Sequence, residues 1–412
     1  MRKYKLGDIA TVEISGVDKK IKDGEKEIRL CNFVDVYYNW AITTAQHDGF
    51  MLATASPNEI SKFQLKKGQV ALTKDSETRD DIGIPTYIAD DFDDAILGYH
   101  CAMVTPNKDI LDGRYLNALL HTDYAKKYFA CNASGSGQRY ALSVEALNSF
   151  PVPIIPLHEQ KQIGEIFSAL DKKIELNKRI NQNLEAMAKQ LYDYWFVQFD
   201  FPDENGQPYK SSGGKMVWNE KLKREIPKGW NVAKLTDEIE LQYGFPFSTD
   251  LFTEQVTSVP VVRIRDILDN SISAYTTEEV EERYLLQKQD LLIGMDGNFH
   301  INYWTDNVSY LNQRSVRLRA KNNSNVSIVQ AKYDIQPYIK AKETRTKGST
   351  VGHLSDKDMK ELYVLVCPNE KAREKLDSIL SMIVKNRNEV TFLIKQRNEL
   401  LPLLMNGQII IE

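Results

Sequence analysis

The chain has 412 residues, which at roughly 100–200 residues per domain predicts two to four domains. Hydrophobic residues make up 42% and charged residues 27%, a composition typical of a globular protein and not of a disordered one. The 53 Lys and Arg against 57 Asp and Glu give a formal charge of −4, which excludes a uniformly basic coat for nucleic acid but not a local basic face.

The cysteines and the apolar runs indicate the compartment. Cys31, Cys101, Cys131 and Cys367 stand far apart and form no C-x-x-C pair, so neither a zinc site nor a redox pair is predicted. Four reduced thiols are expected in a cytosolic protein. The first residues lack an apolar signal region, and no run approaches 18 apolar residues, so neither a secretory signal nor a membrane span is expected.

The chain repeats itself once, because four short motifs recur in the same order. They are Lys5–Asp8 and Lys234–Asp237, Phe33–Val36 and Ile264–Ile267, Val70–Thr73 and Leu291–Gly294, and Leu142–Ser143 and Leu354–Ser355. In the third pair, a turn (Leu65–Gly68 or Leu286–Lys288) leads into an apolar run, which predicts a buried strand. The period is far too long for a solenoid, so we expect one domain-plus-helix unit used twice.

A helical hydrophobic pattern closes each repeat. The first pattern has position a at Ile163, Leu170, Asn177, Leu184 and Leu191, and position d at Ile166, Lys173, Ile180, Met187 and Tyr194. The second has a at Leu376, Ile383, Val390, Arg397 and Leu404, and d at Ile379, Asn386, Leu393 and Leu400. Apolar residues at most of these positions are typical of a coiled coil. The alternative is that each helix packs on its own domain, but two such helices favour pairing with one another.

Two residues within these helices, one polar and one a proline, depart from the apolar pattern. Asn177 is a polar residue at an a position, which can fix the register of a helix pair. Pro402 is expected to kink or end the second helix near Leu401. The predicted boundaries are a first domain at 1–156, a helix at 157–199, a linker at 200–228 rich in Gly, Pro, Ser and charge, a second domain at 229–367, a helix at 368–406 and a tail at 407–412.

Catalytic motifs are largely missing from the sequence. It has no P-loop, no G-x-G-x-x-G after a strand, no [ND]-P-P-[YF], no G-x-S-x-G and no H-E-x-x-H. Its six histidines are scattered, so no metal site and no catalytic residue are predicted. Pro202-Asp203 with Glu220–Lys223 imitates a nuclease P-D…E-x-K pattern, although both parts lie in the linker. An autonomous nuclease and a coiled-coil scaffold without a DNA role therefore remain alternatives.

Charge is segregated along the chain. From Leu311 to Thr350 nine basic residues face two acids, a local net charge of +7, whereas Asp266–Asp290 and Asp81–Asp94 each carry a net charge of −5. A basic segment that holds Tyr333 and Tyr338 can follow a phosphate backbone, although an ordinary solvated face has the same composition.

A loop rich in small residues occupies the matching place in the first repeat. It spans Ala133–Tyr140, where small residues let backbone N–H groups approach phosphate, and Gln138 and Arg139 can read base edges or hold phosphate. A flexible turn is the alternative. The candidate DNA-binding residues are Lys74, Arg79, Ser134, Ser136, Gln138 and Arg139 in the first repeat, and Asn298, Arg314, Lys342, Arg345, Lys347 and Ser349 in the second.

Several motifs in a fixed order resemble the specificity subunits of type I DNA restriction-modification systems. They are Ser134-Gly135-Ser136 with Gln138 and Leu142-Ser143, Pro151–Leu157, Glu159-Gln160, Ile163, Leu170-Asp171, Trp195–Val197 through Phe201-Pro202, Ser211–Met216, and Gly229-Trp230. The resemblance covers essentially the whole chain. The second copy departs from the pattern: Lys347–Thr350 replaces Ser-Gly-Ser, Val351–His353 stands where Gln138–Tyr140 would align, and Asn369–Lys371 replaces His158–Gln160.

This resemblance implies an α+β fold with two target-recognition domains and two long helices that form an antiparallel coiled coil. Each domain would read one half of a split, asymmetric site in double-stranded DNA, and the helix pair would set the spacer between the halves. Two methyltransferase subunits and the restriction subunits would join this chain. S-adenosylmethionine would belong to the methyltransferase subunits, with no cofactor and no catalysis in this chain. A bacterial or archaeal cytoplasm is the expected location.

Overall fold

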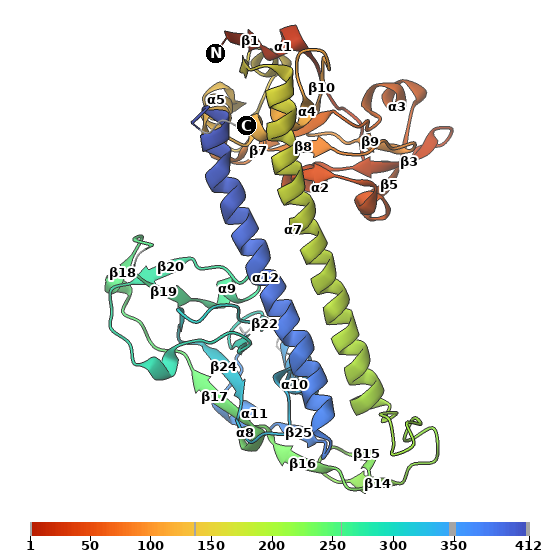
Figure 1. Ribbon diagram of the computed structural model, residues 1–412, viewed down its shortest axis with the longest axis vertical. Helices are drawn as coiled ribbons and strands as arrows, with labels where there is room; N and C mark the ends of the chain where they lie inside the picture. Colours follow the sequence, from red (N-terminus) through yellow and green to blue (C-terminus); the bar gives the residue numbers. More distant parts are fainter. Residues whose placement is uncertain (1, 136, 257, 346–351, 409–412) are drawn as a thin grey trace. The chain divides into compact units, whose positions relative to one another are not determined.

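The computed structural model describes residues 2–135, 137–256, 258–345 and 352–408. It divides into two compact units, unit 1 (Met1–Glu175 and Phe392–Glu412) and unit 2 (Leu176–Thr391), shown in Figure 1. Two long helices, α7 (Leu157–Tyr192) and α12 (Glu370–Met405), each contribute one part to each unit. Helices and strands are mixed in both units, which confirms the predicted α+β class.

Unit 1 is built around a five-stranded sheet in the order β2-β10-β6-β8-β4. Its strands are β2 (Ala10–Ile14), β10 (Cys101–Pro106), β6 (Val70–Thr73), β8 (Pro85–Ile88) and β4 (Ala41–Ile42). A three-stranded sheet holds β5 (Met51–Ala55), β3 (Lys26–Cys31) and β9 (Ala95–Leu97). A second three-stranded sheet holds β11 (Ser134–Gly135), β12 (Tyr140–Ala141) and β7 (Asp75–Ser76). Strands β1 (Arg2–Lys5) and β13 (Pro151–Ile154) form a pair. Its short helices are α1 (Leu6–Ile9), α2 (Phe33–Tyr38), α3 (Pro57–Phe63), α4 (Gly113–Leu120), α5 (Asp123–Asn132) and α6 (Val144–Asn148).

Unit 2 repeats this plan around a four-stranded sheet in the order β17-β24-β21-β22. Its strands are β17 (Ile239–Tyr243), β24 (Ser315–Ala320), β21 (Leu291–Gly294) and β22 (Ile301–Tyr303). A second sheet holds β18 (Phe252–Thr253), β20 (Ala274–Thr276), β19 (Val259–Val262) and β23 (Tyr310–Leu311), and β16 (Asn231–Lys234) pairs with β25 (Tyr363–Val366). The helices are α8 (Leu235–Glu238), α9 (Ile264–Ile267), α10 (Ile328–Arg345) and α11 (Asp356–Lys360).

The predicted internal repeat is confirmed strand by strand. Lys5–Asp8 and Lys234–Asp237 each join the end of an edge strand to a one-turn helix, β1 to α1 and β16 to α8. The apolar runs predicted as buried strands are β6 and β21, and both are fully buried. Ser143 and Ser355 accept hydrogen bonds at the N-termini of α6 and α11, which explains why both repeats carry a serine there.

The buried face of α7 differs by one residue from the prediction. The predicted a positions are confirmed at Ile163, Asn177 and Leu184, which are buried, with Leu170 and Leu191 partly buried. Among the predicted d positions Ile166 is partly buried against the core, but Ile180 is 37% and Met187 54% exposed, so the predicted row is wrong at those two residues. We call the buried face of α7 its seam. Beside the a positions, the second buried row of this seam lies four residues after each of them, at Phe167, Ile174, Asn181, Ala188 and Trp195. Four of five residues are apolar in either row, so hydropathy alone could not choose between them.

Helix α12 (Glu370–Met405) ends close to the predicted boundary at residue 406. Leu376, Ile379, Ile383 and Leu393 are buried as expected, and Val390 and Leu400 are partly buried. Pro402, expected to kink or end the helix near Leu401, does not end it, since α12 extends to Met405 and Leu404 is buried. Pro402 is exposed in the last turn, where the carbonyl left without an amide donor can face water.

The two long helices run antiparallel within each unit. In unit 1, Arg397 late in α12 lies 3.8 Å from Asp171 in the first half of α7. In unit 2, Arg387 in the middle of α12 lies 2.8 Å from Glu185, which is late in α7. Later residues of one helix thus meet earlier residues of the other, as the resemblance implied.

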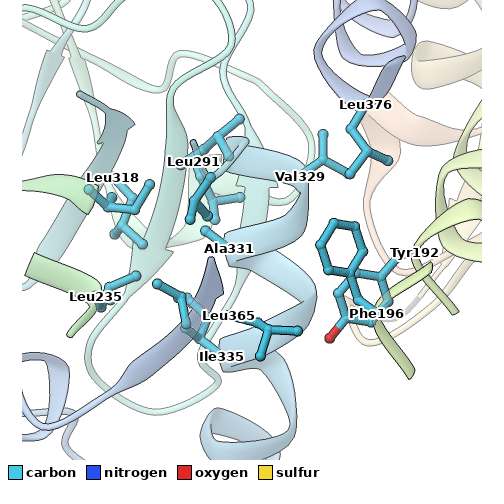
Figure 2. Close-up of a cluster of buried hydrophobic side chains, with 14 of the residues drawn as sticks. Tyr192, Phe196, Leu235, Leu291, Leu318, Val329, Ala331, Ile335, Leu365 and Leu376 are labelled. Atoms are coloured by element: carbon cyan, nitrogen blue, oxygen red, sulfur yellow. The ribbon is translucent and has the colours of Figure 1, made fainter. Parts of the chain in front are cut away.

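The core of unit 2 joins its sheet to both helices. Figure 2 shows Leu291 and Leu318 of the sheet, Val329, Ala331 and Ile335 of α10, and Leu376 of α12 in one buried cluster with Tyr192, the last residue of α7, and Phe196, in the turn that follows. Each fully buried side chain of this kind contributes about 1.5–3 kcal/mol relative to exposure. The end of α7 is therefore fixed to the domain that follows it in sequence.

The segment predicted as a linker is ordered. Phe201 stacks on Tyr209 with ring centroids 4.8 Å apart and on Trp230 at 4.9 Å. Strands β14 (Met216–Asn219) and β15 (Arg224–Pro227) then form an antiparallel hairpin. A five-residue π-helical turn (Asp193–Val197) links α7 to this segment.

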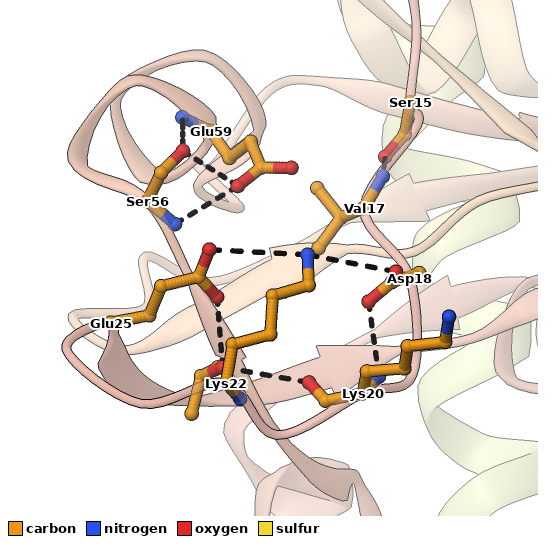
Figure 3. A network of polar contacts seen from close by, with 9 residues as sticks. Ser15, Val17, Asp18, Lys20, Lys22, Glu25, Ser56 and Glu59 are labelled. Carbon is orange, nitrogen blue, oxygen red and sulfur yellow. Dashed lines mark hydrogen bonds and ion pairs between the residues drawn. The ribbon is translucent and has the colours of Figure 1, made fainter.

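A polar network holds the loop before β3 against its neighbours in unit 1 (Figure 3). The backbone N–H of Lys22 donates to the Thr54 hydroxyl at 2.9 Å, and that hydroxyl donates to Glu25 at 2.8 Å. The Lys22 ammonium also lies 3.6 Å from Asp18 and 3.9 Å from Glu25. These contacts hold the exposed part of the loop, while Val17 anchors it in the core of unit 1.

Two sequence expectations concern the chain as a whole. Cys31, Cys101, Cys131 and Cys367 are all free thiols, as predicted. Across the part of the chain that the structure describes, no helix is both long and apolar enough to cross a membrane.

Candidate nucleic-acid interface

A polar cluster forms in unit 1 where β6 ends, and we call it the β6 corner (Lys74, Asp75, His100 and Arg139). The Lys74 ammonium lies 2.9 Å from both oxygens of Asp75, and His100 Nδ1 hydrogen-bonds to Asp75 Oδ2. Arg139 Nη2 lies 3.1 and 3.2 Å from the two ring nitrogens of His100. Backbone bonds fix the corner, since Lys74 N–H donates to the His100 carbonyl at 2.9 Å and Leu142 N–H to the Lys74 carbonyl at 2.8 Å.

The carboxylate of Asp75 is the electrostatic centre of the β6 corner. Its side chain is only 9% exposed. Burial by itself would raise the pKa of Asp75, but hydrogen bonds from His100 and Lys74 outweigh burial and hold that pKa below its usual value. Asp75 therefore stays ionised, and the cations of Lys74 and Arg139 exceed its single negative charge.

The predicted loop of small residues borders this corner. Gly135 permits the tight β11–β12 hairpin, because a Cβ there would stand 2.2 Å from the Arg139 carbonyl oxygen. The Ser134 hydroxyl donates to the Ala141 carbonyl at 3.3 Å, and Gln138 is exposed. The Arg79 guanidinium lies 5.1 Å from the centroid of the Tyr140 ring. The structure thus gathers five predicted residues (Lys74, Arg79, Ser134, Gln138 and Arg139) on β7, β11, β12 and the adjoining turns.

Unit 2 carries a matching cluster where β21 ends, the β21 corner (Asp296, Arg314 and His353). Arg314 Nη1 lies 3.3 Å from Asp296 Oδ2, and His353 Nδ1 lies 2.6 Å from Asp296 Oδ1. The Arg314 side chain is 70% exposed, whereas that of Asp296 is 20% exposed. Asn298, also predicted, is exposed two residues further along. This corner presents a guanidinium to solvent while its carboxylate partner is held behind it.

The basic segment of unit 2 is not the continuous basic face that its charge suggested. Arg317 is 2% exposed, is bound to Glu240, and has a pKa lowered by burial. Arg319 lies 2.6 Å from Asp290.

Two further cations of this segment are also engaged inside the fold. Burial lowers the pKa of Lys332, whose ammonium lies 4.5 Å from the centroid of the Tyr303 ring. Lys342, predicted to bind DNA, pairs with Asp358 and so ties α10 to α11. The acids that pair with Arg317, Arg319 and Lys342 lie elsewhere in the sequence, which a local charge count cannot reveal.

Four predicted residues have no described side chain. Ser136, Lys347 and Ser349 lie outside the described residues, and Arg345 is placed only as the last residue of α10. DNA binding by all twelve candidates stays a prediction.

Sequence reasoning missed the residues that organise both corners, namely Asp75 and His100 in unit 1 and Asp296 and His353 in unit 2. One signal was available, because Asp75 and Asp296 both stand two residues after the matched strands β6 and β21. The contact of His100 with Asp75 had no such signal, since the two residues stand 25 positions apart in the sequence.

The nuclease-like pattern does not assemble a metal site. Asp203 accepts hydrogen bonds from the N–H groups of Asn205 and Gln207, both at 2.8 Å, and so closes a turn. Glu220 pairs with Lys223 at 2.7 Å in the turn of the β14–β15 hairpin. Among the residues placed by the structure, no group of three or more His, Cys, Asp or Glu side chains could hold a metal ion.

The fold and the two corners define a protein with two similar α+β domains and two antiparallel helices. A family model described as the type I restriction modification DNA specificity domain matches residues 1–186 and 227–400. The chain belongs to this family, with one copy of the domain and its helix in each match. The autonomous-nuclease and scaffold alternatives find no support in these comparisons.

Relatives of the chain are named as specificity subunits. The MjaIX specificity subunit of Methanocaldococcus jannaschii is 24% identical over 318 residues, covering 74% of this chain and 71% of the relative. The HindI specificity subunit of Haemophilus influenzae is 33% identical over 141 residues, covering 34% of this chain and 30% of the relative. The chain is therefore a DNA-recognising specificity subunit of a type I restriction-modification system and not a catalytic one.

A solved structure shares the fold. The S subunit of a type I restriction-modification system from M. genitalium superposes with a TM-score of 0.58 at 15% identity, covering 98% of this chain and 95% of that chain.

Proposed function

We propose that the chain reads a bipartite, asymmetric site in double-stranded DNA, with each of its two repeated domains contacting one half-site. The observation that carries this proposal is the repeat itself. In both units the matched strand of the main sheet, β6 or β21, is followed by a polar corner with an exposed arginine, Arg139 in one unit and Arg314 in the other. The residues around the two corners differ, so the two half-sites would differ in sequence.

The helix pair of α7 and α12 would set the number of unread base pairs between the half-sites. Two weak readers gain affinity through effective concentration only if both can engage at once. A helix pair suits this task better than a flexible tether, because its length is fixed at about 1.5 Å per residue.

The partners in this proposal are two methyltransferase subunits and the restriction subunits. S-adenosylmethionine and adenine methylation would belong to the methyltransferase subunits, which the specificity subunit would place on the recognised sequence. We also propose a cytoplasmic location, because the DNA to be recognised lies there.

The experiment is methylation sequencing of host DNA that carries this chain with its methyltransferase subunits. It is repeated with seven residues inserted in each helix, between Glu175 and Leu176 and between Thr391 and Phe392. Seven residues add about 10 Å, which is about three base pairs at 3.4 Å each. We expect both half-sites to be unchanged and the spacer to lengthen.

The matched control inserts the same seven residues in the turn between Asp203 and Gln207, away from both helices, and should leave the spacer unchanged. A methylated site without two separated halves would overturn the proposal. An unchanged spacer after the helix insertion would overturn the role of the helix pair.

A further inference from the structure

The two polar corners share one unusual backbone position. His100 immediately precedes β10 and Arg314 immediately precedes β24, and their φ angles are +68° and +64°. Their carbonyl oxygens accept equivalent hydrogen bonds, from Lys74 N–H at 2.9 Å and from Met295 N–H at 2.8 Å. His100 and Arg314 therefore occupy the same place in the repeated fold.

A positive φ at this place disfavours most side chains, including the arginine of unit 2. A positive φ brings the Cβ of an L-residue close to its own backbone, so glycine, or else asparagine, normally fills such a turn. Unit 2 instead carries an arginine there, and unit 1 carries a histidine, a residue that adopts a positive φ more often than most. The turn could form without either side chain, so we look to the contacts of these side chains for the reason that they are present.

In both units the contact is with a shielded carboxylate. His100 hydrogen-bonds to Asp75, which is 9% exposed, and Arg314 pairs with Asp296, which is 20% exposed. In unit 1 the arrangement continues outward, because Arg139 lies against the ring of His100. Each corner thus presents an exposed guanidinium: Arg314 contacts Asp296 directly, whereas Arg139 contacts His100, which is bound to Asp75.

We propose that Arg314 and Arg139 each read a base edge in one half-site, with His100, Asp75 and Asp296 as positioning residues. This inference rests on the proposed DNA recognition. A guanidinium in a fixed plane can donate two hydrogen bonds to O6 and N7 of guanine, which is a common specific contact in the major groove. A neighbouring carboxylate reduces the attraction to phosphate but holds that plane, so it favours base reading over a backbone contact.

The decisive variant is Arg314→Gly, because glycine removes the side chain and suits the backbone. A purely structural role predicts unchanged or higher stability and unchanged DNA recognition. Base reading predicts the same stability but a loss of affinity of about 5- to 150-fold, the range of one bidentate base contact. Lys223→Gly is the matched control, since Lys223 is an exposed cation of unit 2 that also has a positive φ, +52°.

The assay uses the complex with its methyltransferase subunits and a DNA duplex that carries the site defined by methylation sequencing. Arg314→Gly should relax base preference in one half-site only, and His100→Gly in the other half-site only. Asp296→Asn keeps the cation but loosens its orientation. It should relax the same half-site as Arg314→Gly while leaving the salt dependence of binding unchanged.

Three results are separable. If the wild-type complex protects no bipartite site, both the proposed function and this inference fail. If the wild type protects its site and Arg314→Gly behaves as Lys223→Gly does, the inference alone is overturned. Arg314→Gly could instead weaken binding equally on all duplexes and reduce the slope of log affinity against log salt by about the value of one phosphate contact. In that case Arg314 binds phosphate, and base reading is wrong.

Discussion

The one-residue difference between the predicted and observed faces of α7 can be measured with two identical substitutions. Ile174 lies in the observed seam and is 2% exposed, whereas Ile180 lies at a predicted d position and is 37% exposed. Ile→Ala at a fully buried site costs about 2–5 kcal/mol, because both transfer and cavity energies are lost. For Ile180→Ala the loss of unfolding free energy should stay below about 1 kcal/mol. Much of the Ile180 side chain already contacts water, and alanine favours the helix by up to about 0.7 kcal/mol.

The measurement is urea unfolding of the full chain with both variants, followed by far-ultraviolet circular dichroism. We expect Ile174→Ala to lower the unfolding midpoint clearly and Ile180→Ala to leave it nearly unchanged. Met187→Ala, at a 54% exposed position, is a further control and should resemble Ile180→Ala. If Ile180→Ala lowered the stability as much as Ile174→Ala or more, the observed buried face would be wrong and the predicted face would be correct.

Three further predictions follow from buried groups of unit 2 and one close backbone approach. Burial raises the pKa of Asp334 to about 6 from 3.8, so the folded state binds this proton more tightly, and stability should fall as pH rises from about 4 to about 6. Asp334→Asn should remove that slope in melting curves recorded across this range, and an unchanged slope would contradict the assignment. Gly244→Ala places a Cβ 2.0 Å from a backbone carbonyl oxygen and should destabilise by more than about 2 kcal/mol, whereas Gly16→Ala, with no atom within 4 Å, should change stability by less than about 0.5 kcal/mol in the same unfolding assay. Asp290→Asn leaves Arg319 without its charge partner in a mostly buried position and should cost about 3–5 kcal/mol in urea unfolding, so a loss below about 1 kcal/mol would argue against that pair.

The sequence alone determined the internal repeat, the strands at its core and the two long helices. These features follow from local patterns: apolar runs after turns predict strands such as β6, and heptad spacing predicts α7 and α12. Ser143 and Ser355 were recognised from the sequence as a matched pair, but their role at the starts of α6 and α11 came from the structure. The loop around Arg139 and the exposed Arg314 were also identified as candidates, because their residue types suit DNA.

Only the tertiary structure decided which face of α7 is buried, which cations are neutralised and which residues organise the corners. Each of these depends on groups far apart in sequence. Arg317 is neutralised by Glu240, 77 residues away, and His100 is bound by Asp75, 25 residues away. A charge count or a heptad pattern describes only neighbours along the chain, whereas a burial seam and an ion pair depend on what packs opposite. The left-handed turns at His100 and Arg314 are likewise set by the strands they connect, and no residue preference in the sequence announces them.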